Sequence, residues 1–139
     1  GLADVVFPRS WIESAEFKAW GGGLNSVRRR CAAVLHGRSV VVFGGTEDYD
    51  TALNTTEVLD LDDDGATEAL FTAGPTMATA RSGCAAVRLD ARRVLVVGGS
   101  DNPASFAGSL NTTEILDLET MRFSAGPRML SKRSYCTAI

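Results

Sequence analysis

The sequence predicts an all-β fold built from two copies of a four-stranded antiparallel sheet. The first observation is a repeated string, since residues 53–61 recur as residues 110–118 at an offset of 57 residues. The second is that each copy divides into four short apolar or β-branched runs separated by turn-forming residues. A period near fifty residues indicates supersecondary units that bury their apolar faces against one another.

The four predicted strands follow the same order in each copy. A first run of small and apolar residues precedes a second run that is almost continuously apolar, so the second strand is expected to be covered on both faces. The predicted strands are residues 31–35, 39–43 and 55–61 in the first copy, residues 84–89, 93–97 and 112–118 in the second copy, and in each copy a fourth strand that ends at Phe71 or Phe123.

A pair of glycines ends the second strand of each copy. Gly44 and Gly45 recur as Gly98 and Gly99 in the same context. At this point the backbone must turn sharply and pass close to neighbouring strands, which favours a residue without Cβ and with access to positive φ. The short connections before the second strand and between the third and fourth strands predict hairpins, so each copy is expected to be a meander.

Together these features resemble the kelch repeat, a blade of a β-propeller. The resemblance covers about residues 28–139. It rests on an arginine before the first strand, the diglycine, a Glu-x-x-Asp pattern in the third strand and an aromatic residue in the fourth. The matching residues are Arg28, Arg81, Arg133, Gly44, Gly45, Gly98, Gly99, Glu57, Asp60, Glu114, Asp117, Phe71 and Phe123.

Two positions depart from the usual kelch pattern. Leu59 and Leu116 stand where kelch repeats usually carry a tyrosine, and Phe71 and Phe123 stand in place of a tryptophan. Both changes keep an apolar residue for contact between blades but remove a hydroxyl and an indole N–H. The resemblance therefore implies a divergent kelch repeat.

The repeats divide the chain into four parts. Residues 1–27 are a lead-in or the remnant of a preceding blade, residues 28–80 and 81–132 are complete repeats, and residues 133–139 begin a third. The lead-in favours a short helix over residues 11–20, while the alternative makes Trp20 or Phe17 the aromatic residue of an earlier blade. Closed propellers contain four to eight blades, so we expect further blades in a longer chain or self-association.

Antiparallel order places the segment before the first strand and the loop after the second strand at the same end of each blade. In kelch-like proteins this end commonly binds the ligand, and aromatic and arginine side chains often anchor protein interfaces. We therefore expect a protein partner to contact the loops at residues 46–52 and 100–109 and the segments before the first strands. The candidate contact residues are Glu47, Asp48, Tyr49, Asp50, Asp101, Asn102 and Phe106.

The function expected from these features is a non-catalytic protein-interaction module without a cofactor or metal. The alternative is a fragment of a propeller enzyme, since galactose oxidase-like copper oxidoreductases are similar to kelch propellers. Copper there is bound by histidine and tyrosine, and this chain has one histidine, His36, and two tyrosines, Tyr49 and Tyr135. We expect His36 to lie at the opposite end of the blade from the loops that we predict to bind a partner.

Bulk composition narrows the class of partner. The net charge of −3 favours neither nucleic acid nor a membrane surface, and no apolar run is long enough to span a bilayer. The three cysteines occupy equivalent repeat positions and are expected to be reduced core residues, in keeping with a cytoplasmic protein. Asn54 and Asn111 begin sequons whose recurrence the repeat itself explains.

Overall fold

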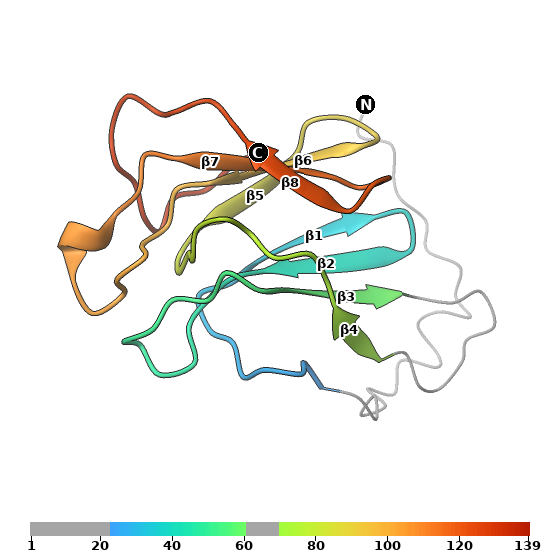
Figure 1. The fold of residues 1–139 in the computed structure, drawn as a ribbon, viewed down its shortest axis with the longest axis horizontal. Coiled ribbons are helices and arrows are strands. Elements are labelled where there is room, and N and C mark those ends of the chain that lie inside the picture. The colour runs from blue at the N-terminus through green and yellow to red at the C-terminus, as the bar shows by residue number, and fades with distance from the viewer. Residues whose placement is uncertain (1–22, 61–69) are drawn as a thin grey trace, which may run out of the picture.

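Each copy of the repeat forms one four-stranded antiparallel sheet (Figure 1). The computed structural model describes residues 23–60 and 70–139, so the helix expected over residues 11–20 lies outside the described part. The all-β prediction is confirmed. The first sheet contains β1 (Ala32–His36), β2 (Ser39–Phe43), β3 (Thr56–Asp60) and β4 (Phe71–Ala73), and the second contains β5 (Ala85–Arg88), β6 (Arg93–Val97), β7 (Thr113–Asp117) and β8 (Arg122–Ala125).

Both sheets are meanders in which strands consecutive in sequence pair with each other. The predicted bounds of β2 and β6 are correct, and those of the first and third strands differ by one residue at each end. The prediction that the fourth strand ends at its aromatic residue is wrong. Phe71 begins β4 and pairs with Leu59 of β3, and Phe123 is the second residue of β8 and pairs with Leu116 of β7, so each strand continues past its aromatic residue.

The core lies between the two sheets and is asymmetric. Val41 and Phe43 of β2 face the second sheet, which contributes Val94 and Val96 of β6 and Leu116 of β7. The buried residues alternate along each strand, because successive side chains of a strand point to opposite faces of the sheet. The face of the first sheet that carries Val41 therefore packs on the face of the second sheet that carries Val94.

A pair of aromatic rings connects the two sheets. The rings of Phe43 and Phe123 meet edge to face, with centroids 6.4 Å apart and an interplanar angle of 79°. This geometry is the one that aromatic quadrupoles favour. Phe123 therefore makes the apolar contact between repeats that the sequence predicts for the fourth-strand aromatic residue.

The repeated Leu-Asn-Thr-Thr-Glu string connects the end of one repeat to its own third strand. The carbonyl groups of Leu53, Asn54 and Thr56 accept N–H groups from the segment after β4, at distances of 2.8–2.9 Å. The hydroxyl of Thr56 also donates to the carbonyl of Pro75 in the same segment. The second repeat reproduces all of these contacts, which gives a physical reason for the near-identity of the two strings.

The diglycine allows the next repeat to approach closely. A Cβ on Gly44, whose φ is +57°, would lie 2.3 Å from the carbonyl oxygen of Arg81, and Gly45 donates its N–H to that same oxygen. Gly98 repeats this arrangement with Arg133. The expectation of positive φ and close backbone approach is confirmed.

The long loops of both repeats extend from the same end of the sheets. In Figure 1 the loop between β2 and β3 and the loop between β6 and β7 both project to the left, while the β1–β2 turn lies on the right. The β6–β7 loop contains the single 3₁₀ turn assigned in the described residues, η1 (Phe106–Gly108). Within residues 23–60 and 70–139, no helix is long and apolar enough to cross a membrane.

Candidate functional site

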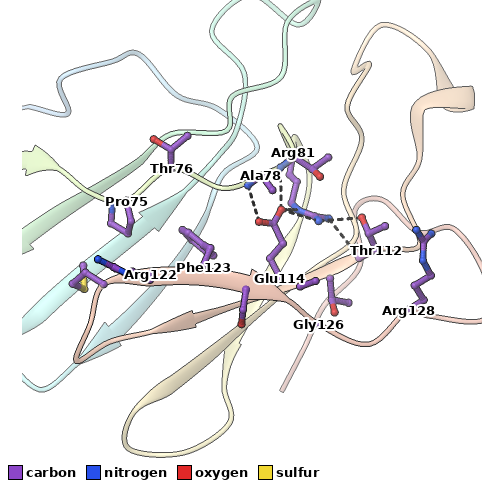
Figure 2. Close-up of a pocket in the computed structure, with 15 residues that line it drawn as sticks. Pro75, Thr76, Ala78, Arg81, Thr112, Glu114, Arg122, Phe123, Gly126 and Arg128 are labelled. Carbon is purple, nitrogen blue, oxygen red and sulfur yellow. Dashed lines mark hydrogen bonds and ion pairs between the residues drawn. The ribbon is translucent and has the colours of Figure 1, made fainter.

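A buried arginine–glutamate pair of the second repeat lies where the two repeats meet. Arg81 is fully buried, and its Nε and one terminal nitrogen donate to Glu114 Oε1 of β7 at 3.2 and 3.0 Å (Figure 2). Its other donors reach the carbonyl groups of Gly98 and Thr112 and the hydroxyl of Thr112. Every N–H direction of the guanidinium fork therefore has an acceptor, which offsets the cost of burying the charge.

The glutamate of this pair also accepts two backbone N–H groups. Ala78 and Thr79 donate to the two carboxylate oxygens of Glu114 at 2.8 and 3.1 Å. These residues stand three and two positions before Arg81, so one short segment supplies three donors to one carboxylate. Because Ala78 and Thr79 belong to the first repeat and Glu114 to the second, these two hydrogen bonds hold the end of the first repeat against the second.

The first repeat contains the same arrangement. Arg28 donates to Glu57 Oε1 at 2.7 Å, and the N–H groups of Asn25 and Ser26 donate to the same carboxylate. Burial alone would raise the pKa of Glu57, but the hydrogen bonds from Asn25, Arg28 and Ser26 outweigh it and lower the pKa below its ordinary value. The carboxylate is therefore held in its charged form.

A groove of about 550 Å³ lies over the Arg81–Glu114 pair, between the segment after β4 and strands β7 and β8 (Figure 2). Phe123 forms part of its wall, and the exposed side chains of Arg122 and Arg128 also line it. Arg81 and Glu114 in this groove already pair with each other, so we interpret the groove mainly as the boundary between the two repeats. No pattern in the sequence predicts this groove.

A second cluster of arginine and tyrosine side chains lies at the loop end of the repeats. We call Arg29, Arg30, Tyr49 and Tyr135 the Arg–Tyr cluster. The guanidinium carbons of Arg29 and Arg30 lie 4.4 and 4.6 Å from the centroid of the Tyr49 ring, and that of Arg30 lies 5.2 Å from the Tyr135 ring. These distances are within the range of cation–π attraction. The four side chains therefore form a stack in the order Arg29, Tyr49, Arg30, Tyr135.

Backbone hydrogen bonds fix the position of this stack. Gly83 donates its N–H to the carbonyl of Arg30, and Tyr135 donates to the carbonyl of Gly83, at 2.8 and 2.7 Å. Arg30, Gly83 and Tyr135 occupy the same position in successive repeats, and all three have φ between 56° and 65°. A Cβ on Gly83 would lie 3.0 Å from the Tyr135 ring, so a glycine at this position leaves room for the ring.

Backbone strain concentrates in the Arg–Tyr cluster. Four non-glycine residues in the described part of the chain have positive φ, namely Arg30, Tyr49, Met121 and Tyr135. Three of these belong to the cluster. Because an L side chain in this region of φ costs free energy and such strain gathers at functional sites, the cluster has a feature typical of a binding site.

A hollow of about 260 Å³ adjoins the stack. Arg30, Tyr135 and Ser134 line one side, and Ser100 with residues 103–105 of the β6–β7 loop line the other. The hollow therefore lies between the segments before the first strands and the loop after the second strand of the second repeat. These are the two kinds of segment that the sequence predicts at one end of the blade.

The predicted contact residues differ in their surroundings. Tyr49 belongs to the Arg–Tyr cluster, and Glu47, Asp50 and Asp101 are exposed on the long loops. Asp48 instead organises its own loop, because its carboxylate accepts the N–H groups of Asp50 and Thr51, which lower its pKa. Asn102 contributes backbone hydrogen bonds within the β6–β7 loop, and Phe106 begins η1. The role of all seven in partner binding stays a prediction.

The arginines of the cluster are functional candidates that are not among the seven predicted contact residues. Arg29 and Arg30 appeared in the sequence only as part of a run of three basic residues before the first strand. The signal that distinguishes them is position, since Arg28 lies at the repeat position of buried Arg81 whereas Arg29 and Arg30 are exposed. Nothing in the repeat pattern indicates that Tyr49 would reach them.

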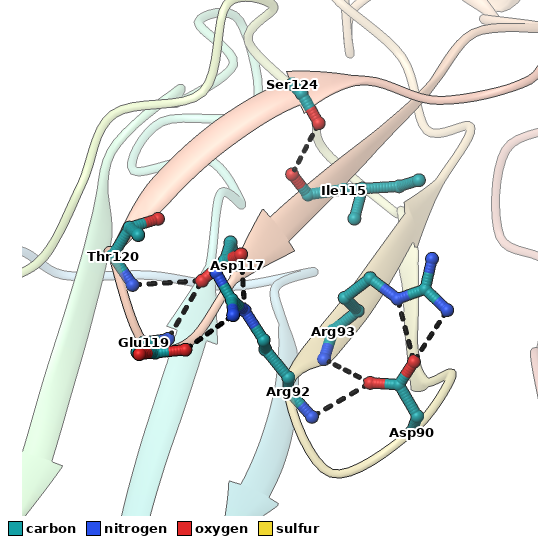
Figure 3. Close-up of polar contacts among 8 residues, drawn as sticks. All are labelled: Asp90, Arg92, Arg93, Ile115, Asp117, Glu119, Thr120 and Ser124. Carbon is teal, nitrogen blue, oxygen red and sulfur yellow. Dashed lines mark hydrogen bonds and ion pairs between the residues drawn. The ribbon is translucent and has the colours of Figure 1, made fainter.

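The aspartate of the Glu-x-x-Asp pattern stabilises a turn at the opposite end of the sheet (Figure 3). Asp117 accepts N–H groups from Thr120 and Glu119 and a hydrogen bond from Arg92 Nε at 2.7 Å. The Thr120 N–H and then Arg92 are the main causes that lower the pKa of Asp117 to about 2. Asp90 caps the neighbouring β5–β6 turn in the same way.

His36 lies at the end of β1, away from the segment that carries the Arg–Tyr cluster. Among residues 23–60 and 70–139, no group of three or more histidine, cysteine, aspartate or glutamate side chains is arranged to hold a metal ion. The three cysteines are free in the structure, but only Cys84 is buried, while Cys136 is half-buried and Cys31 is exposed. The expectation that all three are core residues is therefore wrong for Cys31. Burial raises the pKa of the Cys84 thiol to about 11. Cys84 therefore stays a thiol at neutral pH, as a core residue does.

No known protein-family model matches this sequence, and no curated protein matches it. The kelch resemblance accordingly depends on the repeated residues described above. The structure adds that those residues form two antiparallel meanders packed face to face.

Proposed function

We propose that the chain is a non-catalytic interaction module of kelch-like repeats that binds an acidic segment of a partner protein through the Arg–Tyr cluster. The observation that carries this proposal is the state of the two arginines. Arg29 and Arg30 are exposed and stacked on tyrosine rings, and no carboxylate within the described residues forms an ion pair with either guanidinium.

The chemistry of the cluster suits a carboxylate-bearing partner. Stacking uses the face of a guanidinium and leaves its N–H edge available for forked hydrogen bonds to a carboxylate. Tyr49 and Tyr135 are each about half exposed, at 46% and 54%, and offer apolar area beside the charges. Tyrosine and arginine are the residues most often found at the energetic centre of protein interfaces.

The scaffold supports recognition because it holds the cluster rigidly. Paired strands carry the loops, and the N–H···O chain through Arg30, Gly83 and Tyr135 fixes two of the four stacked residues. A preorganised site loses less side-chain entropy on binding than a flexible one. The adjoining hollow can receive one side chain of the bound segment.

The experiment is a quantitative pull-down from extract of the native source with the wild-type chain and the variants Arg30→Glu and Tyr49→Ala. We expect the proteins enriched by the wild type to be lost by both variants, because charge reversal repels an acidic segment and loss of the ring removes the stack. Arg122→Glu is the matched control, since it reverses an exposed arginine on β8 outside the cluster.

The control should retain the wild-type partners. Equal recovery by Arg30→Glu and by the wild type would contradict the proposal, and so would loss of the same proteins from Arg122→Glu. Circular dichroism of each variant establishes that the fold is kept, which is expected because all three positions are exposed.

A further inference from the structure

The outer edge of the second sheet is open along β8. This strand is the last of its sheet and pairs on one side only, with β7. Gly126 donates its N–H to the Thr113 carbonyl at 3.0 Å, and hydrogen-bonded partners alternate along an antiparallel pair of strands. The same alternation continues along β8, so Phe123 and Ala125 direct their N–H and C=O groups away from β7.

The groove over the Arg81–Glu114 pair follows this open edge. Residues 121–126 all line it, one after another. Successive side chains of a strand point to opposite faces of a sheet, so a hollow on one face would be lined by alternate residues only. The groove therefore runs along the edge of β8, and residues of the segment 75–79 form its other wall (Figure 2).

The first repeat closes the corresponding position with a side chain. Asn25 Nδ2 donates to the Phe71 carbonyl at 2.8 Å, and Phe71 has the register position that Phe123 has in the second repeat. Ala78 stands in place of Asn25, since each of them donates its N–H to the glutamate of the buried pair. A methyl group cannot donate a hydrogen bond. Within residues 23–60 and 70–139, no side chain caps the Phe123 carbonyl.

Met121, at one end of this groove, is the non-glycine residue with positive φ that lies outside the Arg–Tyr cluster. Its φ is 52°, a conformation that glycine adopts without strain. Its side chain lines both the groove and an adjoining hollow of about 350 Å³ that reaches Val58 and Thr72. Methionine is flexible and adapts to different neighbours. Met121 therefore gives the groove an adaptable apolar end that a glycine would not provide.

The shape of the groove suits a single extended chain. A strand edge with free N–H and C=O groups binds a further strand through main-chain hydrogen bonds. The wall formed by residues 75–79 leaves room beside β8 for one strand and obstructs the four-stranded sheet that a second copy would bring. A single strand would place alternate side chains against Met121 and Phe123.

One end of the groove lies close to the hollow beside the Arg–Tyr cluster. Thr112 and Arg128 line that end, and Arg122 lies at the other (Figure 2). Ser109 precedes Thr112 by three residues, which span no more than about 11 Å even when extended. The hydroxyl oxygen of Ser109 lies 3.1 Å from that of Ser134, which lines the hollow. A few residues of extended chain therefore connect the two places.

We propose that the partner segment recognised by the Arg–Tyr cluster continues into this groove and pairs with β8 as a further strand of the second sheet. This inference rests on the proposed function, because pairing along a strand of four residues is too weak to hold a partner by itself. The pairing uses main-chain groups and apolar side chains. It does not use the Arg122 side chain, so Arg122→Glu remains a control for the cluster.

The first measurement is amide hydrogen exchange by NMR, with and without peptides selected from a random library on the wild-type chain. Peptides of about fifteen residues are long enough, since they span roughly 50 Å when extended. We expect bound peptide to slow exchange of the Phe123 and Ala125 N–H groups about tenfold, because both become donors to the added strand. If these groups are as protected in the free chain as that of Ser124, the edge is already occupied and the proposal is overturned.

The second measurement is the affinity of the same peptides for Ala78→Asn, which restores the cap found in the first repeat. We expect binding to weaken about tenfold, because the new side chain occupies the Phe123 carbonyl. Ala78→Ser is the matched control, since its hydroxyl is too short to reach as the Asn25 amide does, and it should bind as the wild type does. Equal affinity of Ala78→Asn and the wild type would overturn the proposal.

Arg30→Glu in the same assay separates this inference from the proposed function. Weaker binding by both Arg30→Glu and Ala78→Asn is the expected result. Weaker binding by Arg30→Glu alone would leave the proposed function standing and overturn the extension into the groove. Weaker binding by Ala78→Asn alone would contradict the proposed function, and it would also show that no single segment bridges the two places.

Discussion

At the scale of single residues, two arginine–carboxylate pairs in the second repeat have similar lengths and very different surroundings. Arg81 and Glu114 are 0% and 5% exposed at 3.0 Å, whereas Arg92 and Asp117 are 52% and 27% exposed at 2.7 Å. Removing one partner of a buried pair leaves a charge without compensation, whereas an exposed pair is largely screened by water. Burial, rather than distance, decides what each pair contributes to stability.

Arg81→Ala is therefore expected to lower the free energy of unfolding by about 3–5 kcal/mol. Arg92→Ala should lower it by no more than about 1 kcal/mol, because its pair is exposed. Urea denaturation of both variants measures the difference. Similar losses in the two variants would show that burial does not decide what each pair contributes.

The carboxylate of Asp117 makes stability depend on pH in a defined window. Its folded pKa of about 2 lies below the ordinary value of 3.8, so its contribution is complete above about pH 4 and is lost as the pH falls through 2. NMR titration of the side-chain carboxyl should give a midpoint near 2. Arg92→Ala should move that midpoint upward, and a wild-type midpoint near 3.8 would contradict the arrangement in Figure 3.

At the scale of secondary-structure elements, the turn after β2 determines how closely the repeats approach. Gly37 and Gly44 have the same φ of +57°, but a Cβ at Gly37 would meet nothing within 4 Å and one at Gly44 would meet the Arg81 carbonyl. Substituting each glycine therefore distinguishes two sources of destabilisation. Gly37 reports the free energy of placing a side chain at positive φ, and Gly44 adds the clash between the repeats.

Gly37→Ala is expected to lower the free energy of unfolding by about 1–2 kcal/mol through the left-handed conformation alone. Gly44→Ala should lower it by about 3 kcal/mol or more, because displacing Arg81 also breaks the buried hydrogen bond from Gly45. Thermal unfolding of both variants tests this. Equal destabilisation would mean that the repeats do not depend on this approach.

The sequence predicted those elements whose side chains repeat, and missed contacts that join distant segments. β2 and β6 were correct because each is an unbroken apolar run ended by glycines. Arg81 and Glu114 were each recognised but not paired, since they are 33 residues apart and no local pattern connects them. The available signal was recurrence, because Arg28 and Glu57 repeat the combination 29 residues apart.

The candidate binding site was predicted at the level of the loop end and not of its residues. The antiparallel order of the strands is enough to place the β2–β3 loop beside the segment before β1. Contact between Tyr49 and Arg30 depends on the path of the β2–β3 loop, whose sequence differs from that of the β6–β7 loop in the second repeat. The repeat period therefore predicts where this surface lies, but it does not predict which side chains stack there.

Over the whole molecule, the candidate binding site and the buried contacts between the sheets lie in different regions. The seam between sheets contains the buried apolar residues and the Arg81–Glu114 pair, whereas the Arg–Tyr cluster is exposed at the loop end. Arg30→Glu and Tyr49→Ala should therefore change the free energy of unfolding by less than about 1 kcal/mol while they abolish partner binding. Urea denaturation beside the binding measurement shows whether the two properties separate.

The central claim is that the Arg–Tyr cluster recognises an acidic protein segment. Selection of a random peptide library on the wild-type chain, followed by binding of the selected peptides to Arg30→Glu, tests it most directly. We expect aspartate and glutamate to be enriched in the selected peptides, and we expect these peptides to bind Arg30→Glu at least tenfold more weakly than the wild type. Peptides without acidic enrichment, or with equal affinity for both chains, would contradict it.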